Sequence, residues 1–328
     1  MSLMVQVSRQ GRSPTTLVLV SFASMVVLGL LLHRFTGTLL RQHFPTQLCK
    51  TNAGSQLGAT EVLVAVRTSP SKHGLREAIR KTMFHPSVRA VLPWQLVFYM
   101  GHSVDLVRSR ALRREVLKGD VIIAPYEAIV QNSVKIFIDA IRWVHEQCAP
   151  HLRYFIHTND TTLVDLLAAH EYIAALNETN ERYFHCVPVQ LVLVNRDTNS
   201  SSFVPEYLFR DDYWPTYCEG DAYIIHAKHL RSLVRGSEAI KQYPRLTQYV
   251  TGHLPVVARV GHKNITRKVR AEGVQQPADE RPIFVSRLKS SSKWKPQWLK
   301  TLICYVGANE TNEMTEKIVD KIKIHMLD

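Results

Sequence analysis

An uncharged, apolar run near the N-terminus constrains this chain more than any other feature. No side chain in residues 13–32 is charged, and Leu, Val, Met and Phe dominate residues 17–32. A helix of this length rises about 30 Å, which is enough to cross the hydrocarbon core of a bilayer. The alternative is a cleaved secretory signal peptide, but no small-x-small cleavage site follows Leu32. The sequence therefore predicts a transmembrane signal anchor at 13–32 behind a short tail at 1–12.

Glycosylation sequons indicate on which side of the membrane the rest of the chain lies. Two basic residues precede the run and three follow it before the first acidic residue, Glu61, so the positive-inside rule leaves the orientation open. Five of the ten asparagines stand in Asn-x-Ser/Thr sequons, and all five follow the run. Such sequons are typical of surface loops in a secreted chain. We therefore predict a cytosolic tail at 1–12 and a luminal body with candidate glycosylation sites at Asn159, Asn177, Asn199, Asn264 and Asn309.

Cysteine number and net charge narrow the function classes. The five cysteines are too few for a disulfide framework and too scattered for a zinc site, so up to two bridges and one free thiol are allowed. A net charge of +13 would suggest nucleic acid in a nuclear protein. In a lumen this charge fits anionic ligands such as nucleotide diphosphates or acidic glycans, or simply a solvated surface. We expect no nucleic-acid partner.

Apolar runs alternate with helical patterns after a polar stem at 33–60. The expected strands are 62–66, 95–100, 121–124 and 153–156, and the expected helices are 73–84, 104–118 and 133–148. This alternation predicts an α/β fold, a mostly parallel sheet covered by helices on both faces, with ligands at the carboxyl ends of the strands.

The second half of the chain carries fewer clear patterns. Two further strands are expected at 189–194 and 222–225. We predict a luminal domain at 61–260 and a variable C-terminal region at 261–328. An apolar stripe in the latter predicts an amphipathic helix that contains Met314, Ile318, Ile322 and Met326.

Four short motifs follow one another between Val64 and Gly252. The chain reads V-A-V-R-T-S at 64–69 before R-E-A-I-R-K-T at 76–82, then Y-F-I-H-T-N-D-T at 154–161, W-P-T-Y-C-E-G-D-A-Y at 214–223 and Y-V-T-G at 249–252. In this order they resemble the β-1,3-galactosyltransferase family, type II Golgi membrane enzymes that use sugar nucleotides. The resemblance implies a glycosyltransferase A-like fold that binds nucleotide sugars.

The same resemblance implies a reaction. A hexose or N-acetylhexosamine would move from a UDP-sugar to a hydroxyl of a glycan acceptor on a glycoprotein or glycolipid. The linkage would be β-1,3 and the anomeric centre would be inverted. Homo- and hetero-oligomers are both compatible with the sequence.

Three residues in these motifs are candidates for binding the nucleotide sugar. Arg76 and Arg80 lie four apart and share one face of the expected helix, and guanidinium groups suit diphosphate oxygens. The alternative is a solvated helix face. The family's acidic D-D-D motif, which the resemblance associates with Mn²⁺ or Mg²⁺, is reduced here to Asp160. We expect Asp160 to be the metal ligand, with a cap of a helix that begins near Thr162 as the alternative.

Other residues of the motifs would contact the sugar or the acceptor. The resemblance implies this role for Trp214, Tyr217 and Gly220, with core packing as the alternative for the aromatic side chains. A glycan on Asn159 would lie at the mouth of the proposed donor site, so either this asparagine is unmodified or the site is not used.

A catalytic base is missing from its expected place. The family has an acidic pair where this chain reads Leu-Thr-Gln at 246–248. Glu219 and Asp221 are the remaining candidates for an acid or base, and a solvated loop carboxylate is the alternative. Because a fold can persist after its site is lost, a second function stays open: a catalytically inactive luminal relative that acts as a chaperone or partner of an active glycosyltransferase.

Overall fold

The computed structural model describes residues 40–46, 48–49, 61–90, 92, 94–149, 151–200, 202–273 and 281–306. The predicted anchor at 13–32, the sequon at Asn309 and the predicted C-terminal helix lie outside this part of the chain. Across the described residues, no helix has both the length and the apolar character that crossing a membrane requires.

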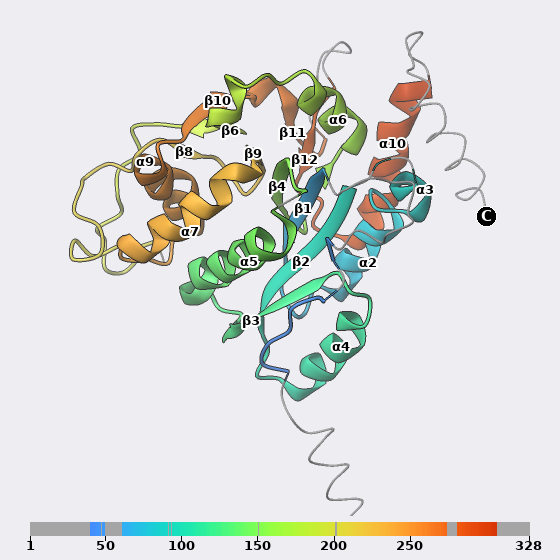
Figure 1. Ribbon diagram of the computed structural model, residues 1–328. Helices are drawn as coiled ribbons and strands as arrows, with labels where there is room; N and C mark the ends of the chain where they lie inside the picture. Colours follow the sequence, from blue (N-terminus) through green and yellow to red (C-terminus); the bar gives the residue numbers. More distant parts are fainter. Residues whose placement is uncertain are drawn as a thin grey trace, which may run out of the picture.

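A mixed seven-stranded sheet forms the centre of the molecule, with strand order β10-β6-β9-β4-β1-β2-β3 (Figure 1). The strands are β1 (Val62–Arg67), β2 (Trp94–His102), β3 (Val121–Glu127), β4 (Tyr154–Asn159), β6 (Tyr183–Cys186), β9 (Tyr223–His226) and β10 (Gly261–Asn264). Strands β1 to β4 are parallel, and β9 runs antiparallel to β4. This reversal brings the residues just before β9 to the edge where β1 and β4 end, which is the ligand edge of such sheets.

Helices cover both faces of this sheet, and the alternation of side chains along β1 shows how. Val64 packs in a core with α2 (His73–Lys81), α6 (Leu166–Ala174) and α10 (Trp294–Val306). Its neighbours Leu63 and Ala65 point to the opposite face, into a second core with α5 (Ser133–Cys148) and α7 (Leu230–Ala239). The remaining helices are α3 (Pro86–Arg89), α4 (Leu106–Val116), α8 (Leu246–Gln248) and α9 (Leu254–Ala258).

Two small sheets accompany the central sheet in the described part of the chain. They are β11-β12-β5, formed by Val269–Ala271, Phe284–Ser286 and Leu163–Val164, and β7-β8, formed by Pro188–Val189 and Tyr217–Cys218.

The predicted elements of the first half are confirmed, with shifts at their ends. The helix predicted at 133–148 is α5 with those bounds, whereas the helix predicted at 73–84 ends at Lys81. The strand predicted at 189–194 forms only in part. Pro188–Val189 pair with β8 and Leu193 forms an isolated β-bridge with Tyr213, but Leu191 has a φ of 55°, a left-handed conformation that interrupts the strand.

The region after residue 260 contains more structure than its sequence pattern indicated. Strand β10 pairs with β6 in the central sheet, and Trp294 and Trp298 of α10 are fully buried. The predicted domain boundary, after residue 260, therefore falls between α9 and β10. Strand β10 belongs to the central sheet.

Two disulfides, Cys49–Cys148 and Cys186–Cys218, join distant parts of the chain. Just upstream of Cys49, His43 forms a β-bridge with Ile123 of β3. The described part of the predicted stem is thus joined to the domain by a disulfide and a β-bridge. Two bridges match the number that the sequence allowed and fit an oxidising compartment.

Candidate functional site

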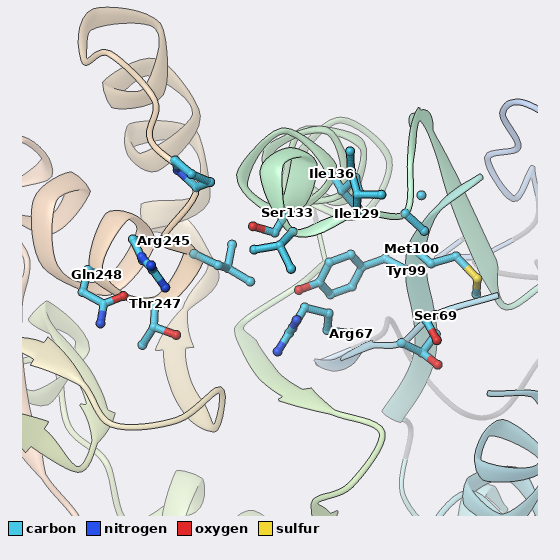
Figure 2. Close-up of a pocket in the computed structure, with 16 residues that line it drawn as sticks. Arg67, Ser69, Tyr99, Met100, Ile129, Ser133, Ile136, Arg245, Thr247 and Gln248 are labelled. Carbon is cyan, nitrogen blue, oxygen red and sulfur yellow. The ribbon is translucent and has the colours of Figure 1, made fainter. Parts of the chain in front are cut away.

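A cavity of about 330 Å³ lies at the carboxyl ends of β1 and β2. Figure 2 shows Arg67 and Tyr99 on one side of it and Arg245 and Thr247, from the segment around α8, on the other. Ser133, the first residue of α5, forms part of the wall. Of the described residues that line the cavity, none has a carboxylate or an imidazole, and the charged ones are both arginines. The lining therefore favours an anionic ligand.

Arg67 and Asp221 form an ion pair at the edge of this cavity. Asp221 reaches this position because it lies just before β9, which runs antiparallel to β4. The same carboxylate accepts a hydrogen bond of 3.1 Å from Asn159 Nδ2 and one of 3.5 Å from Thr247 Oγ1. Burial alone would raise the pKa of Asp221, but the Arg67 guanidinium more than offsets burial and the pKa is lowered. Asp221 is therefore ionised, and its carboxylate binds two residues that line the cavity, Arg67 and Thr247.

A buried tyrosine and histidine lie next to this ion pair. His157 Nδ1 lies 2.6 Å from the backbone oxygen of Asp221, and its Nε2 lies 2.6 Å from the hydroxyl oxygen of Tyr99. Since a carbonyl oxygen can only accept, Nδ1 carries the proton and Nε2 accepts from Tyr99. Burial lowers the pKa of His157 to about 4, so the imidazole is neutral at pH 7. The pair thus holds the Asp221 backbone in place from inside the sheet.

Asp160 has a separate set of contacts. Its carboxylate is nearly buried and accepts a hydrogen bond of 2.6 Å from Thr68 Oγ1, and burial raises its pKa. The alternative role as a helix cap near Thr162 is wrong. The next helix, α6, begins at Leu166, and its cap is Asp165, which accepts from the backbone N–H groups of Leu167 and Ala168.

Asp160 is not part of a cation site made of described protein groups alone, and its role as a metal ligand stays a prediction. Mg²⁺ is often bound by one or two carboxylates together with substrate phosphates and waters. Among the described residues, the one group of three acidic or imidazole side chains close enough to share an ion is His73, Glu77 and Glu115, which does not include Asp160. Even in that group Glu115 is already bound to arginine.

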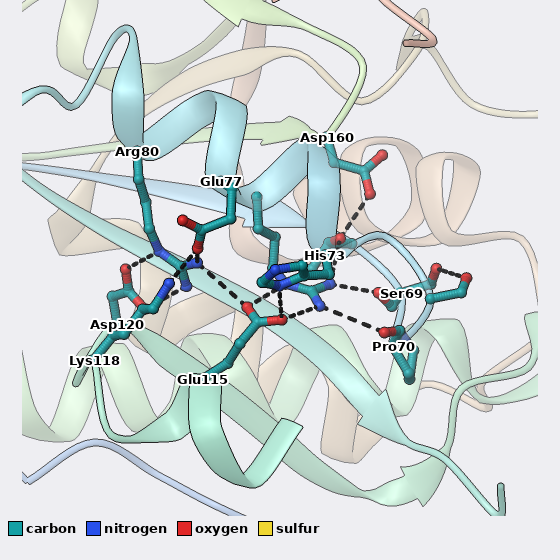
Figure 3. Close-up of polar contacts among 12 residues, drawn as sticks. Ser69, Pro70, His73, Glu77, Arg80, Glu115, Lys118, Asp120 and Asp160 are labelled. Atoms are coloured by element: carbon teal, nitrogen blue, oxygen red, sulfur yellow. Dashed lines mark hydrogen bonds and ion pairs between the residues drawn. The ribbon is translucent and has the colours of Figure 1, made fainter. Parts of the chain in front are cut away.

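Arg76 and Arg80, the predicted nucleotide ligands, are both held in ion pairs within the protein. Figure 3 shows Arg80 next to Glu77 and Asp120. Arg76 is fully buried, and Glu115 accepts from its Nε at 2.7 Å and its Nη2 at 2.6 Å. The other acceptors of Arg76 are the Thr68 hydroxyl and the carbonyl oxygens of Ser69 and Pro70. These contacts occupy all the N–H groups of Arg76 and fix the turn after β1.

Arg80 is also paired within the protein. It binds Asp120 through two hydrogen bonds of 2.8 Å and Glu77 through one of 2.6 Å. Direct contact of Arg76 and Arg80 with a diphosphate stays a prediction, and in the structure both hold protein groups together.

The last two predicted motifs meet in space. The backbone N–H of Cys218 donates to Thr251 Oγ1 at 3.0 Å, and a Cβ added at Gly252 would lie 3.1 Å from the Cβ of Tyr217. Trp214, in contrast, is buried against Phe209 and Tyr243. Its contact with a sugar, like that of Tyr217 and Gly220, stays a prediction.

The two candidates for the acid or base differ in position. Glu219 is exposed, whereas Asp221 lies in the contacts at the cavity edge. The structure thus brings together Asp221 and Asn159, and it adds residues that the sequence interpretation missed: Arg67, Tyr99, Ser133, Arg245 and Thr247. One available signal was that Arg67 is the last residue of a parallel strand, where ligand contacts concentrate.

Comparison with known proteins identifies the family. The family model described as galactosyltransferase matches residues 75–266, more than half of the chain. The chain therefore belongs to the galactosyltransferase family.

Two human proteins illustrate the degree of similarity. The chain is 26% identical to beta-1,3-galactosyltransferase 9 over 50% of its own length and 44% of the relative's. It is 24% identical to acetylgalactosaminyl-O-glycosyl-glycoprotein beta-1,3-N-acetylglucosaminyltransferase over 68% of its own length and 59% of the relative's. The chain thus spans about half the length of the curated relatives it matches.

Proposed function

We propose that the chain is a glycosyltransferase that moves a hexose or N-acetylhexosamine from a UDP-sugar to a glycan hydroxyl on a glycoprotein or glycolipid. The observation that carries this proposal is the arginine-lined cavity at the carboxyl ends of β1 and β2. Parallel strands bind nucleotides at this edge, and the cavity volume is in the range of small-molecule sites, about 300–1,000 Å³. The names of the relatives support a β-1,3 linkage and include more than one donor sugar.

In this proposal the fold is glycosyltransferase A-like and the reaction inverts the anomeric centre. Such a reaction must stabilise the negative charge that grows on the departing diphosphate and must remove a proton from the acceptor hydroxyl. Arg67 and Arg245 line the cavity and supply positive charge for the first task. Asp221 orients Arg67 and Thr247, and its lowered pKa makes it a weaker base than an unpaired carboxylate.

The proposed location is the Golgi membrane, with one helix at 13–32 and a luminal domain. Two observations support the luminal assignment. Four cysteines form the disulfides Cys49–Cys148 and Cys186–Cys218, and three sequon asparagines of the domain are exposed: Asn177, Asn199 and Asn264.

One observation favours the second candidate function, a catalytically inactive partner or chaperone of an active glycosyltransferase. No carboxylate lines the cavity among the described residues, and Asp221 is held by Arg67. A chain of this kind would bind a nucleotide without transferring a sugar.

A transfer assay with the full chain in detergent distinguishes the two. UDP-galactose, UDP-N-acetylglucosamine and UDP-N-acetylgalactosamine are each incubated with a panel of β-galactosides, N-acetylglucosaminides and N-acetylgalactosaminides. UDP release is measured together with the mass of the acceptor. An acceptor enlarged by one sugar supports the transferase. UDP binding without a product supports the inactive partner, and no UDP binding contradicts the site assignment.

A further inference from the structure

The arginine at the end of β1, Arg67, differs from Arg76 in how much of its guanidinium the protein uses. In Arg76 all three nitrogens have protein acceptors. In Arg67 only Nη2 has one, the carboxylate of Asp221. Nε of Arg67 is buried without a hydrogen-bond partner, Nη1 has no hydrogen bond to a described residue, and 40% of the side chain is exposed. A guanidinium held on one side and unpaired on the other is prepared for a ligand with several acceptor oxygens.

The carboxylates near this arginine are not arranged to hold a cation. Asp160 accepts from Thr68, and the positive charges of Lys72 and Arg67 act on it. Asp221 accepts from Arg67, Asn159 and Thr247. A divalent ion would have to displace these donors and approach past the arginines that line the cavity. The donor set therefore favours an anion at this edge.

The identity of residue 159 fits the same arrangement. As an amide, Asn159 donates through Nδ2 to the Asp221 oxygen that also binds Arg67. A carboxylate at this position would face Asp221 with a like charge and would weaken the ion pair. The amide of Asn159 and the carboxylate of Asp221 therefore together hold Arg67 in place.

We propose that Arg67, positioned by Asp221 and Asn159, binds the diphosphate of the nucleotide in the role that a divalent cation would otherwise fill. Nucleotide binding by this chain is then independent of metal. The inference rests on the proposed function, since it names the group that neutralises the diphosphate of the same donor.

Calorimetric titration of the purified full chain with UDP tests this, once in EDTA and once with Mn²⁺. The inference predicts equal affinity under both conditions. Arg67→Gln should weaken UDP binding about tenfold or more in each, because a charge-assisted hydrogen bond is lost. Arg67→Lys should recover part of the affinity by restoring the charge. Arg89→Gln, at an exposed arginine outside the cavity, should leave the affinity unchanged.

Asn159→Asp separates the two ways of neutralising the diphosphate. If Arg67 binds it, the added carboxylate weakens UDP binding in EDTA and Mn²⁺ does not restore it. If a metal binds it, Asn159→Asp strengthens UDP binding when Mn²⁺ is present. Binding of UDP to the wild type that requires Mn²⁺ overturns the inference and leaves the proposed function standing. Absence of UDP binding under every condition overturns both. Thermal unfolding of each variant shows whether it is folded.

Discussion

Glu115 of α4 receives two hydrogen bonds from Arg76 of α2, at 2.7 Å from Nε and 2.6 Å from Nη2, in a place where both side chains are buried. Burial alone would raise the pKa of Glu115, but the bonds from Arg76 outweigh burial and lower it to about 2. Through Arg76, this carboxylate supports the turn after β1 that forms one wall of the cavity.

Removal of this carboxylate should destabilise the fold strongly. Glu115→Ala leaves the Arg76 charge buried without its partner, which costs about 3–5 kcal/mol. The matched control is Glu238→Ala, since exposed Glu238 lies 3.5 Å from Arg142. A surface pair of this kind contributes about 1 kcal/mol or less. Denaturant unfolding measures both free energies, and equal losses would show that Glu115 has no special role.

The buried histidine predicts a pH dependence of stability. In the unfolded chain the pKa of His157 is near 6.5, and burial lowers it in the folded state to about 4. The unfolded state therefore binds more protons between these values. The contribution of neutral His157 to the free energy of unfolding is fully present above pH 6.5 and is lost as the pH falls toward 4. This contribution amounts to at most about 3 kcal/mol.

Burial also lowers the pKa of other histidines, among them His185, so the stability of the wild type is compared with that of a variant that lacks His157. The free energy of unfolding of the wild type and of His157→Gln is measured from pH 7.5 to pH 4.5. The wild type should lose more stability on acidification than the variant. Parallel curves would mean that His157 is not buried in its neutral form.

The sequons should differ in occupancy. Asn177, Asn199 and Asn264 are exposed, whereas the Nδ2 of Asn159, the atom that would carry a glycan, donates to Asp221. In the folded chain from secretory cells we expect glycans at the exposed positions and none at Asn159. Peptide mass spectrometry after enzymatic deglycosylation in heavy-oxygen water gives the occupancy of each site. A glycosylated Asn159 in the folded chain would contradict the Asn159–Asp221 contact.

Strand and helix periodicity predicted the parallel half of the fold because β1 to β4 are apolar and separated by amphipathic helices. It failed where long-range pairing decides the structure. Strand β10 (Gly261–Asn264) is a short polar edge strand that exists because β6 lies beside it, and no local pattern of its residues indicates this. Likewise, Trp294 and Trp298 belong to the core only because α10 packs on the sheet.

The sequence predicted where the candidate site lies, but it predicted only some of the residues that form it. The carboxyl edge of the sheet was expected, and Asp221 and Asn159 lie there. Arg76 and Arg80 were selected by helical spacing, which does not reveal that Glu115 and Asp120 are close enough to bind them. Arg67 and Asp221 are 154 positions apart in sequence, and only the reversal of β9 brings them together.

The most direct test of the account is whether the cavity at this edge holds the nucleotide. A tryptophan placed at Ser133, the first residue of α5 and part of the cavity wall, would fill the space. Calorimetric titration with UDP should show affinity reduced about tenfold or more in Ser133→Trp. Affinity should be unchanged in Ser292→Trp, at an exposed serine outside the cavity. Wild-type affinity in Ser133→Trp, with the variant folded, would contradict the assignment of this cavity as the donor site.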